Sequence, residues 1–148
     1  MAEHIQISTE AGCFDALAAG PQDGREVMLL HGFPESGLQW SAQLEVLGNA
    51  RCRAVAPDQR GYSPGVRPEQ VADYRMEALV GDVLDIADSL GWHEFDLVGH
   101  DWGAAVAWNT AAAHPERVRT LTAVSIPHPD PVQDAVRQDE DQRMRSAY

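Results

Sequence analysis

The turn Gly99-His100-Asp101-Trp102-Gly103 stands between a short apolar run and an alanine-rich segment. Residues 95–98 have the composition of a buried strand, and residues 104–113 that of a helix that Pro115 ends. Glycine on both sides of a central residue permits the crowded backbone of a tight strand-to-helix turn, which presents the central side chain at the carboxyl edge of a sheet. We therefore predict that Asp101 has a positive φ and is raised at such an edge, with its side chain facing a cleft that it shares with Phe33. An ordinary helix N-cap is the alternative interpretation of Asp101.

The rest of the chain alternates between apolar strands and amphipathic helices. Four short runs rich in β-forming residues are strand candidates: residues 27–30, 52–56, 95–98 and 121–126. Between the second and third runs, apolar side chains recur at helical spacing: Met76, Leu79, Val83, Ile86 and Leu90. This alternation predicts an α/β fold with a mostly parallel sheet, flanking helices and right-handed crossovers. Residues 5–18 predict an antiparallel hairpin before the parallel part.

Composition narrows the possible partners. The 148 residues suffice for one domain, and their net charge is −12, with arginine as the only cationic residue type besides histidine. Such an acidic surface repels phosphate backbones and anionic lipids, so we expect neither a nucleic-acid nor a membrane partner. No apolar run approaches the roughly 20 residues of a membrane helix, and the first residues do not resemble a secretory signal, so we expect a cytoplasmic protein. Cys13 and Cys52 lack metal-type spacing and are interpreted as small, buried apolar residues.

A carboxylate at the centre of the turn implies a particular reaction. Asp101 is ionised at neutral pH without an activating base, so it can attack an sp3 carbon that carries a leaving group. The product is an alkyl ester on the enzyme, which water must cleave with the help of a general base and an oxyanion hole. One donor to that hole is the backbone N–H of Trp102, and the other is expected on the loop that follows the first parallel strand.

Four segments together resemble the α/β-hydrolase superfamily and, within it, the epoxide hydrolases and their dehalogenase relatives. They are His31-Gly32-Phe33-Pro34, Asp58-Gln59-Arg60-Gly61-Tyr62, Gly99-His100-Asp101-Trp102-Gly103 and Ser125-Ile126-Pro127-His128-Pro129. The resemblance implies that Asp101 is the nucleophile, that Phe33 and Trp102 donate to the oxyanion, and that the Phe33-Pro34 bond is cis. No cofactor or metal is implied.

The histidines of these segments receive more modest roles. We place four residues at the substrate-binding part of the site: His31, Pro34, His100 and His128. The family's chain order places the catalytic histidine after the nucleophile, so His31 and His100 are interpreted as supports for the loop and the turn. His128 is a possible substitute base. Arg60 is expected to form an ion pair in its loop, and Asp130 to cap a helix.

The resemblance also implies that this chain is incomplete. The fold it resembles continues with a lid, two more strands, and loops that carry a catalytic acid and histidine. We therefore expect residues 1–129 to form the N-terminal part of the core and residues 130–148 to begin the lid. In the family, lid tyrosines protonate the alkoxide that forms on epoxide opening, and Tyr148 lies close to the expected position of the first. An ordinary amphipathic tyrosine at a frayed terminus is the alternative.

These features favour an epoxide hydrolase-like enzyme that acts on a small molecule. Phe33 stands where haloalkane dehalogenases commonly carry a second N–H donor for the departing halide, which disfavours the alternative of a haloalkane or haloacid dehalogenase. A truncated, non-catalytic remnant that lacks the base is the other alternative. Loss of later strands would leave residues 121–126 as an apolar, uncharged sheet edge, so we also expect self-association.

Overall fold

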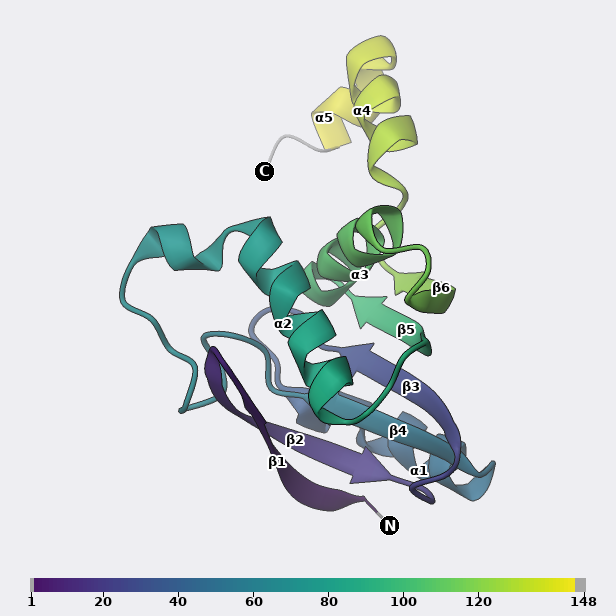
Figure 1. Cartoon of the computed structure of the whole chain (residues 1–148). Coiled ribbons are helices and arrows are strands. Elements are labelled where there is room, and N and C mark those ends of the chain that lie inside the picture. Colours follow the sequence, from purple (N-terminus) through teal and green to yellow (C-terminus); the bar gives the residue numbers. More distant parts are fainter. Residues whose placement is uncertain (1, 146–148) are drawn as a thin grey trace.

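The computed structural model describes residues 2–145, which form a six-stranded sheet with the order β1-β2-β4-β3-β5-β6 (Figure 1). β1 and β2 are an antiparallel hairpin, β2 pairs antiparallel with β4, and β4, β3, β5 and β6 are parallel. The predicted α/β class and the hairpin are confirmed. The strands are β1 (Glu3–Thr9), β2 (Gly12–Ala19), β3 (Arg25–Leu30), β4 (Cys52–Pro57), β5 (Phe95–His100) and β6 (Val118–Val124).

Helices cover both faces of the sheet (Figure 1). On one face, side chains of α2 (Met76–Ser89) and α3 (Trp102–Ala113) pack on Met28 and Leu30 of β3. On the other, Leu44 of α1 (Ser41–Asn49) and Trp40 of the 3-10 helix η1 (Gly37–Trp40) pack on Val27 and Leu29. Alternate side chains of β3 therefore enter two separate cores, as expected for a central parallel strand. A second 3-10 helix, η2 (Val71–Tyr74), precedes α2.

The last strand differs from its predicted bounds. β6 begins at Val118, opposite Phe95, rather than at residue 121, and it ends at Val124 rather than at residue 126. It begins earlier because pairing with β5 draws polar residues into the ladder, a tertiary effect that local apolarity does not reveal. It ends earlier because Ser125 has a φ of 70°, and the Ile126 carbonyl accepts a hydrogen bond from the Trp108 indole at 3.1 Å instead of extending the ladder.

Two further helices follow the sheet: α4 (Pro129–Gln138) and α5 (Glu140–Arg145), which Figure 1 shows extending away from α3. The expectation that Asp130 caps a helix is wrong. His128 is the N-cap, and its Nδ1 accepts a hydrogen bond from the Asp130 N–H at 3.2 Å. Pro129 occupies the first helical position, which proline favours, so the cap lies two residues earlier than expected. The assignment of residues 130–148 to a lid stays a prediction.

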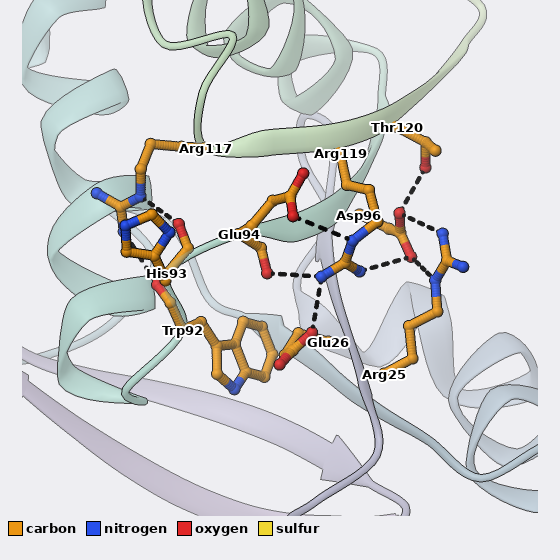
Figure 2. Close-up of polar contacts among 9 residues, drawn as sticks. All are labelled: Arg25, Glu26, Trp92, His93, Glu94, Asp96, Arg117, Arg119 and Thr120. Carbon is orange, nitrogen blue, oxygen red and sulfur yellow. Dashed lines mark hydrogen bonds and ion pairs between the residues drawn. The ribbon is translucent and has the colours of Figure 1, made fainter.

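A polar network joins the amino ends of β3, β5 and β6, at the opposite end of the sheet from Asp101 (Figure 2). Its centre is the buried Asp96 carboxylate, which accepts hydrogen bonds from Nε and Nη2 of the Arg25 guanidinium and from the Thr120 hydroxyl. Arg119 bridges Asp96, at 3.4 Å, and Glu26, at 3.0 Å. Charges from three strands thus satisfy one another where the strands begin.

Three smaller expectations can also be compared with the structure. Arg60 forms the predicted ion pair, with Asp82 of α2 at 2.6 Å. Cys13 and Cys52 are both free and half-buried, so they are less enclosed than predicted. None of the helices within residues 2–145 is long and apolar enough to cross a membrane.

Candidate active site

Asp101 occupies the strained turn between β5 and α3 that the sequence predicts. Its φ of 53° lies in the left-handed region, which a residue with a side chain rarely adopts, so the predicted positive φ is confirmed. The flanking glycines permit this approach. A Cβ on Gly99 would lie 2.3 Å from the Gly103 carbonyl oxygen, and one on Gly103 would lie 2.3 Å from that of Leu30. Close contact of β5, α3 and β3 therefore fixes the turn.

The carboxylate of Asp101 is held by backbone N–H groups. The Phe33 N–H donates to Asp101 Oδ1 at 2.9 Å, which confirms the predicted approach of these two residues. The backbone N–H groups of Phe33 and Trp102 hold the pKa of Asp101 below its usual range. These are the two donors that were expected to serve the oxyanion. Asp101 Oδ1 already accepts from the Phe33 N–H, one of these two donors.

The direction of the Phe33 N–H follows from the carbonyl on the other side of the same peptide bond. The Gly32 carbonyl oxygen accepts hydrogen bonds from His31 Nδ1 at 2.9 Å and from the Glu35 N–H at 3.0 Å. In a trans peptide the C=O and N–H point in opposite directions, so fixing this oxygen aims the Phe33 N–H at Asp101. The next bond, Phe33-Pro34, is cis, as the resemblance implied.

His31 is fully buried beneath this loop and is locked in one neutral form. Its Nε2 accepts the Gln59 N–H at 3.0 Å while its Nδ1 donates to Gly32, which defines the tautomer. Burial lowers the pKa of His31, and the ring edge packs on Tyr62 with centroids 4.6 Å apart. With both nitrogens engaged, His31 supports the loop and has no free lone pair with which to act as a base.

Gln39, which the sequence analysis missed, connects the loop of residues 31–34 to the turn of residues 99–103. Its Oε1 accepts the Gly32 N–H at 3.2 Å, and its Nε2 contacts His100 Nδ1 at 2.8 Å. His100 also lies 3.6 Å from the Glu35 carboxylate. A glutamine in a short 3-10 helix carries no motif signal, so only the fold reveals this contact.

An apolar cavity of about 230 Å³ adjoins the two donor residues. Phe33 and Trp102 line it with largely exposed side chains, 71% and 59% respectively. Burial and the charge of Asp101 raise the pKa of Tyr62, whose ring also lines the cavity. The remaining lining residues are His31, Gly32, Gln59, Arg60, Tyr74, Leu79 and Val106. The arrangement can hold a small apolar molecule beside a carboxylate.

The other predicted site residues lie elsewhere. Pro34 is exposed on the loop and does not line this cavity. His128 lines a separate cavity with Trp108, whose ring centroid is 4.9 Å away, so the structure does not bring His128 to Asp101. Tyr148 lies outside the described residues. Among residues 2–145, no three His, Cys, Asp or Glu side chains converge to hold a metal ion.

Comparisons with known proteins place this geometry among its relatives. Residues 26–147 match the family model described as alpha/beta hydrolase fold. An AB hydrolase superfamily protein of Bacillus subtilis is 37% identical over 96% of this chain and 50% of its own length. Epoxide hydrolase B of Mycobacterium tuberculosis is 46% identical over 76% of this chain and 32% of its own. The chain thus spans half or less of these relatives.

Solved structures give the same result. A crystal structure of an epoxide hydrolase from Vigna radiata has a TM-score of 0.80 at 37% identity, covering 85% of this chain and 41% of that one. A structure described among novel epoxide hydrolases in metagenomes from hot environments has a TM-score of 0.83 at 36% identity, covering 97% of this chain and 48% of that one.

Proposed function

Because this chain belongs to the α/β-hydrolase family, in which its relatives include epoxide hydrolases, we propose that it opens small epoxides with Asp101 as the nucleophile. The observation that carries this proposal is the contact between Asp101 Oδ1 and the Phe33 N–H at 2.9 Å, beside an apolar cavity. A carboxylate with a lowered pKa is ionised wherever the protein is folded near neutral pH.

The first step forms an ester. The Asp101 Oδ1 atom is engaged by backbone N–H, so Oδ2 is the atom that attacks a ring carbon of the epoxide. A C–O bond of the ring breaks, and its electron pair goes to the departing oxygen as an alkoxide. We assign the proton for that alkoxide to the Tyr148 phenol, which water then reprotonates.

The second step is hydrolysis of the ester. Oδ1 becomes the carbonyl oxygen of the ester and stays beside the N–H groups of Phe33 and Trp102. When water attacks the carbonyl carbon, negative charge develops on Oδ1, where these donors stabilise it. The C–O bond between the former carbonyl carbon and Oδ2 of the alkyl ester then breaks, which releases a diol and restores the carboxylate. No cofactor takes part in either step.

The attacking water needs a general base, and His100, next to Asp101 in the chain, does not offer one, because its Nδ1 accepts a hydrogen bond from the Gln39 amide and its Nε2 then carries the proton. His31 has both ring nitrogens engaged, and His128 lines a different cavity. For the 148-residue chain tested alone, ester formation should therefore outpace ester hydrolysis. Loss of a general base slows a step by about 10² to 10⁴.

The cavity favours epoxides over alkyl halides. Its lining supplies apolar side chains for an aryl or alkyl substituent, including Phe33, Leu79 and Val106. A departing halide needs N–H donors, and of the two residues beside the nucleophile only Trp102 has a side-chain N–H. The site thus suits a leaving oxygen that takes up a proton better than a halide.

A matched pair of substrates tests the reaction class. Styrene oxide and phenethyl bromide share a carbon skeleton, and each would be incubated with the protein while epoxide loss and bromide release are followed. The proposal predicts consumption of about one equivalent of epoxide per chain and no bromide release above that of the Asp101→Asn variant. Bromide release that depends on Asp101 would support the dehalogenase alternative. Reaction with neither compound would support a non-catalytic remnant.

A further inference from the structure

Gln39 lies outside both the oxyanion loop, residues 31–34, and the nucleophile turn, residues 99–103, and its side chain forms a hydrogen bond to each of them. Its orientation is unambiguous. The Gly32 N–H can only donate, so the Gln39 atom facing it at 3.2 Å must be the amide oxygen. The amide NH₂ is then the group that donates to His100 Nδ1 at 2.8 Å.

We propose that Gln39 is a positioning residue that sets the distance between the Phe33 N–H and the Asp101 carboxylate. This inference rests on the proposed function, because it concerns the alignment of the donor for the reacting carboxylate. Gln39 contacts neither Asp101 nor the cavity, so it acts through Gly32 and His100.

The peptide that joins His31 to Gly32 is held at both ends: Gln59 Nε2 donates to the His31 carbonyl at 2.6 Å, and Gln39 accepts from the Gly32 N–H. Gly32 lies directly against the nucleophile, since a Cβ at this position would be 2.6 Å from the Asp101 Cβ. Without the Gln39 acceptor, this peptide would be held by Gln59 at its carbonyl end, and the Gly32 N–H would turn toward water and tilt the peptide about that hydrogen bond. Because peptides 31–32 and 32–33 share the Gly32 Cα, the rotation would turn the Phe33 N–H away from Asp101.

The contact also determines the state of the His100 ring. Accepting from Gln39 requires a bare Nδ1, so neutral His100 must carry its proton on Nε2. A proton on Nδ1 would break this hydrogen bond and favour the Glu35 carboxylate, 3.6 Å away. Glu35 and Asp101 are charged groups that face this ring, and the Gln39 amide is neutral. The ring thus reports directly on whether the contact is intact.

Two substitutions separate positioning from general stability. Gln39→Ala removes both hydrogen bonds. Gln39→Glu retains an acceptor for the Gly32 N–H but replaces the donor to His100 with a carboxylate, which favours a proton on Nδ1. Gln43→Ala, on the exposed surface of α1, is the matched control. For each variant, the rate of ester formation with styrene oxide, the ¹⁵N spectrum of the His100 ring, the Gly32 and Phe33 amide signals, and the melting temperature would be measured.

We expect Gln39→Ala to slow ester formation by up to about 10²-fold, since misplacing a reacting group by about 1 Å can cost that much in rate, and to shift the Gly32 and Phe33 amides. Gln39→Glu should retain most of the rate, because its carboxylate still accepts from the Gly32 N–H, and should change the ¹⁵N spectrum of the His100 ring, because it no longer donates to Nδ1. Gln43→Ala should match the parent protein. If Gln39→Ala lowers the melting temperature but leaves the rate, the amides and the His100 spectrum unchanged, the positioning role is wrong. If the parent protein forms no ester, the proposed function fails, and the spectra alone still decide whether Gln39 sets the geometry.

Discussion

The Asp101 carboxylate is oriented by backbone rather than by titratable side chains. The N–H groups of Phe33 and Trp102 lower its pKa and do not themselves change charge with pH. The loop that carries Phe33 does depend on a titratable side chain, because His31 must stay neutral to donate through Nδ1 and accept through Nε2 at once. The geometry of the site therefore depends on the protonation of a residue that does not touch the nucleophile.

The ring of His31 is expected to resist protonation in the folded protein. Burial lowers its pKa from the ordinary value of about 6.5. The unfolded chain therefore takes up this proton first as pH falls, and the contribution of His31 to the free energy of unfolding declines below about pH 6.5. An NMR titration of the ring would test this, with the urea-unfolded chain as control. Equal midpoints in the two states would show that the ring is not constrained as described.

The sequence predicts the role of residues that belong to a local motif. It does not predict the role of residues that depends on contacts made only in the folded chain. Asp101 stands between two glycines after an apolar run, which is a local pattern. Gln39 has no such pattern, since its partners are Gly32 and His100. The sequence analysis also missed His128 as the N-cap of α4, a position that follows from Pro129 at the first helical position.

At the scale of elements, α3 approaches the sheet closely because Gly99 of β5 and Gly103 of α3 itself lack side chains. Replacing Gly103 with alanine would place a Cβ 2.3 Å from the Leu30 carbonyl oxygen, and we expect the free energy of unfolding to fall by about 3 kcal/mol. Gly81 in α2 is the matched control, since a Cβ there meets nothing within 4 Å. Gly81→Ala should be stabilising by about 0.5–1 kcal/mol. Urea unfolding of both variants checks this, and similar effects would contradict the packing described.

The network at the amino ends of the strands should couple stability to pH. Burial alone would raise the pKa of Asp96, but hydrogen bonds from Arg25 and Thr120 and the charges of the arginines outweigh it and lower that pKa. Asp96→Asn should therefore cost about 1–3 kcal/mol at pH 7. The contribution is present above the unfolded pKa of about 3.9 and is lost as pH falls through the lower folded value.

Urea unfolding of Asp96→Asn at pH 7 and at pH 3 measures this dependence. The difference from the parent protein should shrink at the lower pH, because the parent then begins to lose the same charge. Asp23→Asn, an isosteric change at an exposed loop position, should alter stability by less than about 0.5 kcal/mol. A difference that stays constant with pH would show that the charge of Asp96 is not what stabilises the strands.

Strand positions were predicted best where burial is greatest. The bounds of β4 and β5 differ from the predictions by only one or two residues, because both strands lie inside the sheet and are buried along most of their length. β6 differs more. It lies at the edge, where alternate side chains are exposed and pairing with β5 rather than apolarity decides where it begins.

For the whole molecule, the open edge of β6 is the feature with the clearest consequence. Within residues 2–145, β6 pairs only with β5, and its second half carries no charge. Unpaired apolar edges promote association, so we expect the 148-residue chain to self-associate at high concentration despite its net charge of −12. Thr122→Lys should reduce this association by charging the edge.

Sedimentation velocity over a range of concentrations measures the effect. His4→Lys, which adds the same charge on the opposite edge strand β1, is the control and should associate like the parent protein. A monomer at every concentration, or equal effects of the two substitutions, would contradict association through β6.

Covalent labelling tests most directly the proposal that Asp101 is a carboxylate nucleophile oriented by the Phe33 and Trp102 N–H groups. The folded chain would be incubated with styrene oxide for hours, since slow turnover is expected, and then analysed by intact mass and peptide mapping. We predict one adduct per chain, located on Asp101, absent from Asp101→Asn and retained in Asp23→Asn. An adduct on another residue, or a folded sample that never gains mass and produces no diol, would contradict the account.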